Sequence, residues 1–113
     1  MSGAPPEYAP TAAEAFLLAL IRHRESNNNY KSPPNMGSTA SGAYRFINGT
    51  WALVAKRTGV GTNYKRAKDA PPVDQDYNAL DLLRRVGPND TLSWHASGPY
   101  PTLAECTFAM QFA

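Results

Sequence analysis

Apolar side chains recur at helical spacing close to the start of the chain. The recurring positions are Ala13, Phe16, Leu17, Leu20, Ile21 and then Arg24. Residues 11–14, Thr-Ala-Ala-Glu, have the spacing of a capping box, in which the Thr side chain caps the helix and the Glu side chain reaches back to the cap. Asn side chains at 27–29 then compete with helical backbone hydrogen bonds. The pattern predicts a helix over residues 12–25.

A Gly- and Pro-rich loop follows, and after it come a short aromatic segment and a second helix. Residues 44–46 are expected to form a short strand or an extended turn. Asn48 is the expected N-cap of a helix that carries Trp51 and Leu53 and ends at Gly59. We expect Trp51 to lie in the core, because apolar residues surround it.

Two more helices complete the prediction. Asp74 is the expected N-cap of the third, which Gly87 closes, and a second capping box at residues 102–105 begins the last. The predicted fold is therefore mostly α, a small domain with little or no β-structure. Residues 1–10, which include three Pro, are expected to be an extended leader, and residues 11–113 a single domain.

Composition and charge restrict the function. The net charge is +2 over 113 residues, which is too weak to indicate nucleic-acid binding, so no nucleic-acid partner is expected. The basic run at residues 56–68 is expected to be a solvated surface, with attraction to an anionic wall polymer or contacts to nucleic acid as alternatives. Cys106 is the single cysteine, which excludes an internal disulfide and multi-cysteine zinc sites. We expect no metal and no cofactor.

Glu25 is the strongest candidate for chemistry. It lies one turn beyond Ile21, at the edge of the apolar stripe of the first helix, where partial loss of water raises a carboxyl pKa and suits a proton donor. A Gly-aromatic segment, with Gly42, Tyr44 and Phe46, follows it in the chain. A glycosidase holds its general acid over a sugar bridge in this manner. A solvated surface carboxylate is the plainer alternative.

These residues resemble a known family. The motifs are Glu25-Ser26-x-x-x-Tyr30, Ser41-Gly42-Ala43-Tyr44-x-Phe46 and Thr50-Trp51. Over residues 14–84 the chain resembles the transglycosylase-like domain of the lysozyme superfamily, which occurs in lytic transglycosylases and resuscitation-promoting factors. The resemblance implies that Glu25 is the catalytic acid and Ser26 a supporting hydrogen-bonding group beside it. It also implies a glycan cleft lined by Tyr30, Gly42, Tyr44, Arg45 and Phe46.

Two positions depart from the family pattern. Arg45 stands where family members usually have Gln, and an Arg side chain cannot accept a hydrogen bond. Arg45 could instead pair with Glu25 and hold it ionised, which would weaken it as an acid. Arg24 stands where resuscitation-promoting domains often have a Cys, so Cys106 has no partner for a cross-link.

The distribution of acids indicates the type of reaction. A hydrolytic glycosidase needs a second carboxylate facing the first at ~5–9.5 Å, but no Asp or Glu occurs between Ser26 and Lys68. A lytic transglycosylase needs only one Glu, which protonates the bridging oxygen and then deprotonates the sugar's own 6-hydroxyl. This favours the non-hydrolytic reaction. Hydrolysis with a distant Asp69, Asp74 or Asp76 remains an alternative.

The sequence therefore predicts an enzyme that cleaves the MurNAc-β-1,4-GlcNAc bond of peptidoglycan. No signal peptide or membrane-spanning segment is evident, so we expect no membrane insertion, and we expect action in the bacterial cell wall after phage lysis or delivery by a virion. Peptidoglycan glycan strands and other virion proteins are the expected partners. The alternatives are a non-catalytic glycan-binding or virion structural module of the same fold, and a nucleic-acid-binding helical domain.

Overall fold

The computed structural model describes residues 7–90, 94 and 97–112. Its helices are α1 (Ala12–Ser26), α2 (Asn48–Thr58), the 3-10 turn η1 (Ala67–Asp69), α3 (Pro72–Val86) and α4 (Leu103–Met110). Within the described ranges, β-pairing is limited to one antiparallel bridge between Ser41 and Phe46. The mostly α fold class is therefore confirmed.

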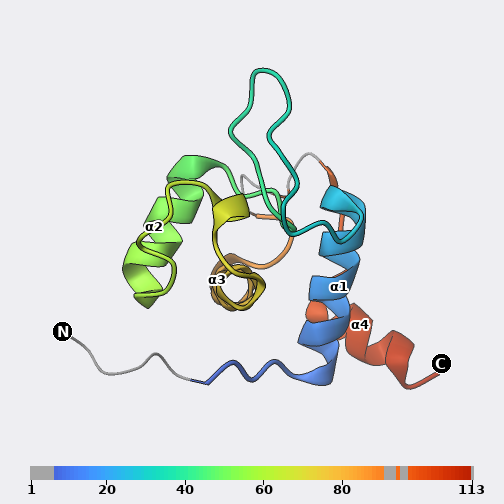
Figure 1. Ribbon diagram of the computed structural model, residues 1–113. Coiled ribbons are helices and arrows are strands. Elements are labelled where there is room, and N and C mark those ends of the chain that lie inside the picture. The colour runs from blue at the N-terminus through green and yellow to red at the C-terminus, as the bar shows by residue number, and fades with distance from the viewer. Residues whose placement is uncertain (1–6, 91–93, 95–96, 113) are drawn as a thin grey trace.

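The helices surround α3. Figure 1 shows α3 end-on between α2 on one side and α1 on the other, while α4 packs against α1. The loop that joins α1 to the 41–46 turn projects from the body as a long teal arm (Figure 1). None of the helices in the described part of the chain is both long and apolar enough to cross a bilayer.

Helix α1 begins as predicted, and the face that it buries agrees with the prediction in part, because Leu17 and Ile21 are fully buried. The capping box of Thr11 and Glu14 is present, and the helix continues to Ser26, where Asn27 adopts the left-handed conformation. Phe16, expected on the apolar stripe, is 49% exposed, and Leu18 is fully buried instead. The buried stripe also includes the carboxylate of Glu14, because Arg84 of α3 reaches it with hydrogen bonds of 2.8 Å.

The predicted caps of α2 and α3 are wrong. Asn48 is the first residue of α2 rather than its cap, and its backbone N–H is satisfied by the hydroxyl of Thr39. Asp74 lies within the first turn of α3, which begins at Pro72. Proline suits this first position because its fixed φ matches a helix and no N–H needs a partner there. The helices end at Gly59 and Gly87, as expected.

The core is a cluster of aromatic rings. Phe46 lies 5.3 Å from Trp51 and 6.2 Å from Trp94, measured between ring centroids. The indole N–H of Trp94 donates to the backbone oxygen of Tyr44 at 2.8 Å. The prediction that Trp51 belongs to the core is confirmed, but its neighbour Leu53 faces solvent and is 63% exposed.

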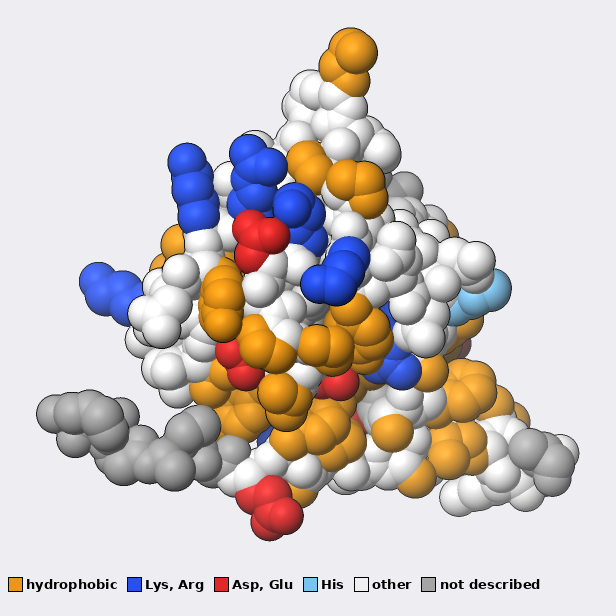
Figure 2. Space-filling view, viewed as in Figure 1, with side chains coloured by type: hydrophobic (Ala, Val, Ile, Leu, Met, Phe, Trp, Pro, Cys, Tyr) orange, Lys and Arg blue, Asp and Glu red, His pale blue; other side chains and the backbone are white. Residues whose placement is uncertain are grey.

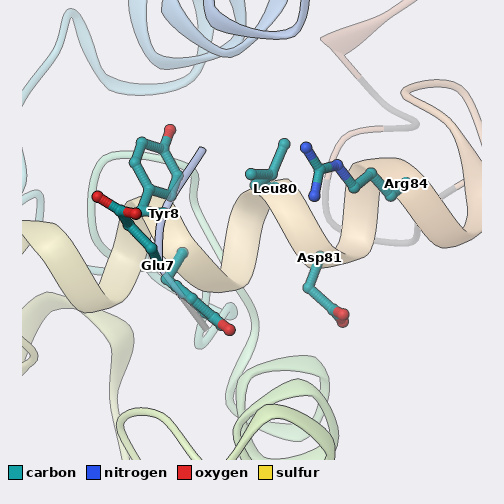
Figure 3. Close-up of a pocket in the computed structure, with 6 residues that line it drawn as sticks. Glu7, Tyr8, Leu80, Asp81 and Arg84 are labelled. Atoms are coloured by element: carbon teal, nitrogen blue, oxygen red, sulfur yellow. The ribbon is translucent and has the colours of Figure 1, made fainter. Parts of the chain in front are cut away.

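The described part of the predicted leader, residues 7–10, lies against α3, and residues 1–6 fall outside the described ranges. Arg84 donates to the backbone oxygen of Ala9 at 3.0 Å, and Tyr8 packs on the core. A small hollow of about 160 Å³ lies in this region. Figure 3 shows residues that line it. Its lining residues are Glu7, Tyr8, Tyr77, Leu80, Asp81 and Arg84.

Candidate functional site

Glu25 is half-buried in the last turn of α1. The hydroxyl of Tyr100 donates a hydrogen bond to its Oε2 at 2.7 Å, and the Ser97 side chain also bonds this carboxylate. Burial raises the pKa of Glu25 above its usual value. The hydrogen bonds from Tyr100 and Ser97 and the charge of Arg45 oppose this rise and are the smaller effects. The direction of the shift is the one expected from the position of Glu25 on the apolar stripe.

Tyr100 is held over Glu25 by two neighbouring groups. The guanidinium carbon of Arg24 lies 4.9 Å from the centroid of the Tyr100 ring, and Arg24 also donates to the backbone oxygen of Pro99 at 3.0 Å. Asn89 bonds both backbone groups of Tyr100, at 2.6 and 2.8 Å. These contacts leave Tyr100 only 3% exposed. No spacing in the sequence indicates that Tyr100 meets Glu25.

Ser26 joins α1 to the turn at residues 41–46. Its hydroxyl donates to the backbone oxygen of Ala43 at 2.8 Å and accepts from the backbone N–H of Asn29 at 3.0 Å. It also approaches the backbone oxygen of Arg22 at 3.2 Å. These bonds give Ser26 a structural function, because they fix the turn beside the end of the helix rather than holding the Glu25 carboxylate.

Gly42 is a point of close backbone approach, but its neighbour is a side chain of the protein. Its φ is +80°, and a Cβ built on it would lie 2.6 Å from Oε1 of Gln75. That oxygen accepts from the backbone N–H of Ala43 at 2.9 Å, while Nε2 of Gln75 donates to the backbone oxygens of Tyr30 and Ala70 at 3.0 and 2.8 Å. Gln75, buried in α3, therefore holds the turn in place.

The rings of Tyr44 and Phe46 are fully buried, so they do not line an exposed cleft as the family resemblance implied. Both are needed in the aromatic core, where each lies 6.2–6.4 Å from Trp94. The Tyr44 hydroxyl instead donates to Oδ1 of Asp76 at 2.7 Å, and the hydroxyl of the half-buried Tyr30 donates to the same atom at 2.7 Å. Burial, reinforced by Asp76, raises the pKa of Tyr30 to about 12.

Arg45 adopts the left-handed conformation, with φ of 54°. Its guanidinium donates to the hydroxyl of Ser32 at 3.0 Å and to the backbone oxygen of Pro33 at 2.6 Å. It forms no ion pair with Glu25 in the described structure, although its charge acts at a distance to lower the pKa of that carboxyl. The pairing that could have held Glu25 ionised is therefore not formed, and burial determines the direction of its pKa shift.

Two of the three other acids considered from the sequence, Asp69 and Asp76, have partners of their own. Asp76 accepts the two tyrosine hydroxyls and lies 3.7 Å from Arg22, and Asp69 pairs with Lys68 at 3.0 Å. The groups that shift the pKa of Glu25 include no carboxylate. No group of three or more His, Cys, Asp or Glu side chains that could hold a metal ion occurs among the described residues.

No protein-family model, curated protein or solved structure matches this chain. The likeness to the lysozyme superfamily therefore stays a prediction from the short motifs that begin at Glu25. The site itself is a half-buried carboxyl at the end of a helix, and a tyrosine hydroxyl donates a hydrogen bond to one of its oxygens.

Proposed function

We propose that this chain is a peptidoglycan lytic transglycosylase that cleaves the MurNAc-β-1,4-GlcNAc bond. The observation that carries the proposal is the environment of Glu25, a half-buried carboxyl whose pKa is raised by burial. A raised pKa keeps more of the carboxyl protonated toward neutral pH, which a general acid requires.

The proposed reaction uses Glu25 twice. As an acid it gives its proton to the bridging oxygen, and the electron pair of the breaking C1–O bond leaves with that oxygen. As a base the resulting carboxylate takes the proton of the sugar's 6-hydroxyl, whose oxygen bonds to C1 and closes a 1,6-anhydro ring. The Tyr100 hydroxyl, which donates to Glu25, stabilises the ionised form present between the two steps.

No carboxylate is among the described groups that shift the pKa of Glu25, and this favours the reaction over hydrolysis. The described groups that act on Glu25 are two hydroxyl-bearing side chains and a cation. Asp76 of α3 accepts hydrogen bonds from the hydroxyls of Tyr30 and Tyr44. In this proposal the protein acts on glycan strands in the bacterial cell wall, is encoded by a phage and is carried with other virion proteins or released at lysis.

The proposal is tested by the release of soluble muropeptides from purified peptidoglycan. Glu25→Gln is expected to lower the rate by about 10²–10⁴-fold, because a general acid contributes about that much. Glu105→Gln is the matched control, because it makes the same substitution at a carboxylate that bonds the backbone of Thr102 in the capping box of α4. Equal rates for the wild type and the Glu25 variant would refute the assignment.

A non-catalytic glycan-binding or virion structural module of the same fold is the second candidate. Its support is that Tyr100 covers Glu25, while Tyr44 and Phe46 are buried. Co-sedimentation with insoluble peptidoglycan separates the two candidates. Binding that survives Glu25→Gln, without products from either protein, would favour the module over the enzyme.

A further inference from the structure

The charges of the chain are divided between two parts of the sequence. Residues 27–68 contain seven Lys and Arg and no Asp or Glu, a net charge of +7. The rest of the chain contains four Lys and Arg and nine Asp and Glu, a net charge of −5. The overall charge of +2 therefore conceals a strongly basic lobe, formed by the projecting loop, the 41–46 turn, α2 and the start of η1.

Part of this basic charge is neutralised within the protein. Arg57 bonds Asp81 at 3.0 Å through Nε, and Lys68 pairs with Asp69. The remaining exposed cations, which form no ion pair with any described residue, are Lys31, Lys56, Lys65 and Arg66. Figure 2 shows blue Lys and Arg side chains gathered over α2 and η1 on the face in view.

Two of these cations flank a hollow beside α2. The hollow has a volume of about 560 Å³, which is within the range of ligand-binding clefts. Its lining residues are Ala52, Ala55, Lys56, Thr62, Asn63, Tyr64 and Lys65. Lys56 and Lys65 are donors for an anion, and the Thr62 hydroxyl and the Asn63 amide can bond hydroxyl groups between anions. None of the described residues that line it is acidic.

The lining also restricts the kind of polyanion. Single-stranded nucleic acid is held by aromatic side chains on which successive bases stack. Tyr64 is the one aromatic residue in the lining, and it is half-buried against the core. Its neighbour Trp51 is fully buried and donates its indole N–H to the backbone oxygen of Tyr64. The hollow therefore suits phosphates separated by hydroxyl-bearing units rather than by bases.

We propose that the hollow between α2 and residues 62–65 binds a polymer of polyol or sugar units joined by phosphodiesters. Lys56 and Lys65 contact its phosphates, and Thr62 and Asn63 contact its hydroxyls. The inference does not depend on the chemistry of Glu25, because Glu25 is not among the residues that line this hollow.

The test is the binding of fluorescently labelled poly(glycerol phosphate) to the full chain, measured by anisotropy over a range of salt concentrations. Lys56→Gln and Lys65→Gln are each expected to weaken binding about fivefold and to reduce the slope of log K against log salt by about 0.7. Arg85→Gln is the matched control, because it removes the same charge from the exposed face of α3, outside the basic lobe. Thermal unfolding checks that all three variants remain folded.

The expected result is binding by the wild type and by Glu25→Gln, with losses confined to the two Lys variants. Three results would each overturn the proposal. They are no binding at low salt, equal weakening by Arg85→Gln, and tighter binding of a single-stranded oligonucleotide with the same number of phosphates. Because Glu25→Gln should still bind, failure of this proposal is distinguishable from failure of the enzyme proposal.

Discussion

At the scale of single residues, the environment of Glu25 was predictable and its partner was not. Its position one turn after Ile21 predicts partial burial, and burial is the main cause of its raised pKa. The Tyr100 hydroxyl comes from a residue 75 positions later. The contact forms because the segment before α4 lies against the end of α1. Hydrophobic periodicity along the sequence gives no information about this arrangement.

The hydrogen bond from Tyr100 yields a prediction about the acidity of Glu25. Because this bond stabilises the ionised form, Tyr100→Phe should raise the pKa of Glu25 further. Carboxyl chemical shifts in an NMR titration report the pKa of Glu25 directly. The alkaline limb of the pH–rate profile should move to higher pH as this pKa rises. Tyr30→Phe is the control, since its hydroxyl bonds Asp76 instead. An unchanged Glu25 titration in the Tyr100 variant would contradict the role assigned to this contact.

Gly42 gives a second prediction at this scale. Gly42 and Gly37 have nearly the same φ, +80° and +82°, but only Gly42 is in close contact with a side chain, that of Gln75. Gly37→Ala should cost about 1 kcal/mol, the strain of the left-handed conformation. Gly42→Ala should cost about 3 kcal/mol, because the new Cβ also displaces Gln75. Urea unfolding of both variants measures the difference, and equal losses would mean that Gln75 does not hold the turn.

At the scale of elements, helix ends with a local signal were predictable. Both capping boxes and the glycines that end α2 and α3 are found where the sequence places them. The predicted starts of α2 and α3 are wrong, because Asn48 and Asp74 are residue types usual at an N-cap but lie inside the helices. In α3 the true start is at Pro72, which suits the first helical position better than Asp74.

The face of α1 was also predicted only in part. Glu14 was expected in the capping box, and it also accepts two hydrogen bonds from Arg84 of α3. Glu14 is buried in this contact between helices, whereas Phe16 is exposed. Because Arg84 is 70 positions away, the local pattern could not reveal that a charged residue belongs to the buried stripe.

The contact between Glu14 and Arg84 predicts an acid-sensitive link between α1 and α3. Glu14→Gln should lower the free energy of unfolding at neutral pH by about 2 kcal/mol, allowing for the half-exposed Arg84. The matched control is Glu105→Gln, which alters the other capping box, where no Arg takes part. Its stability should remain close to that of the wild type.

The pH dependence has a defined sign. The pKa of Glu14 is lowered to about 2 from 4.5, chiefly by its hydrogen bonds with Arg84. The stabilisation is therefore complete above pH 4.5 and is lost as the pH falls toward 2. Denaturant unfolding between these limits should show the wild type and the Glu14 variant converging at the acid end. A constant difference across the range would contradict the shifted pKa.

Glu25 acts in the opposite direction. Its pKa is raised in the folded protein, so its contribution to stability is complete below the unfolded value and is lost as the pH rises through the folded value. A Gln side chain does not ionise, so Glu25→Gln removes this loss of stability at higher pH. The variant should therefore gain stability relative to the wild type as the pH rises, as measured by the same denaturant series.

At the scale of the whole molecule, α3 is the central support. Gln75 holds the 41–46 turn, Asp76 accepts the hydroxyls of Tyr30 and Tyr44, and Arg84 holds α1. The fold class follows from helical periodicity alone. The meeting of these contacts on α3 cannot be predicted from periodicity, because each contact joins residues that are distant in the sequence. The candidate acid therefore lies on a helix that is fixed from two sides, by α3 and by the segment containing Tyr100.

The most direct test of the central claim is the chemistry of the products. Purified peptidoglycan is digested with the wild type and with Glu25→Gln, and the soluble fragments are resolved by mass spectrometry. The account predicts 1,6-anhydro-muropeptides from the wild type and none from the variant. Reducing, hydrated ends would contradict the single-acid reaction and indicate a second carboxylate, with Asp69, Asp74 and Asp76 as the first to replace. No cleavage of any wall type by the wild type would contradict the enzyme itself.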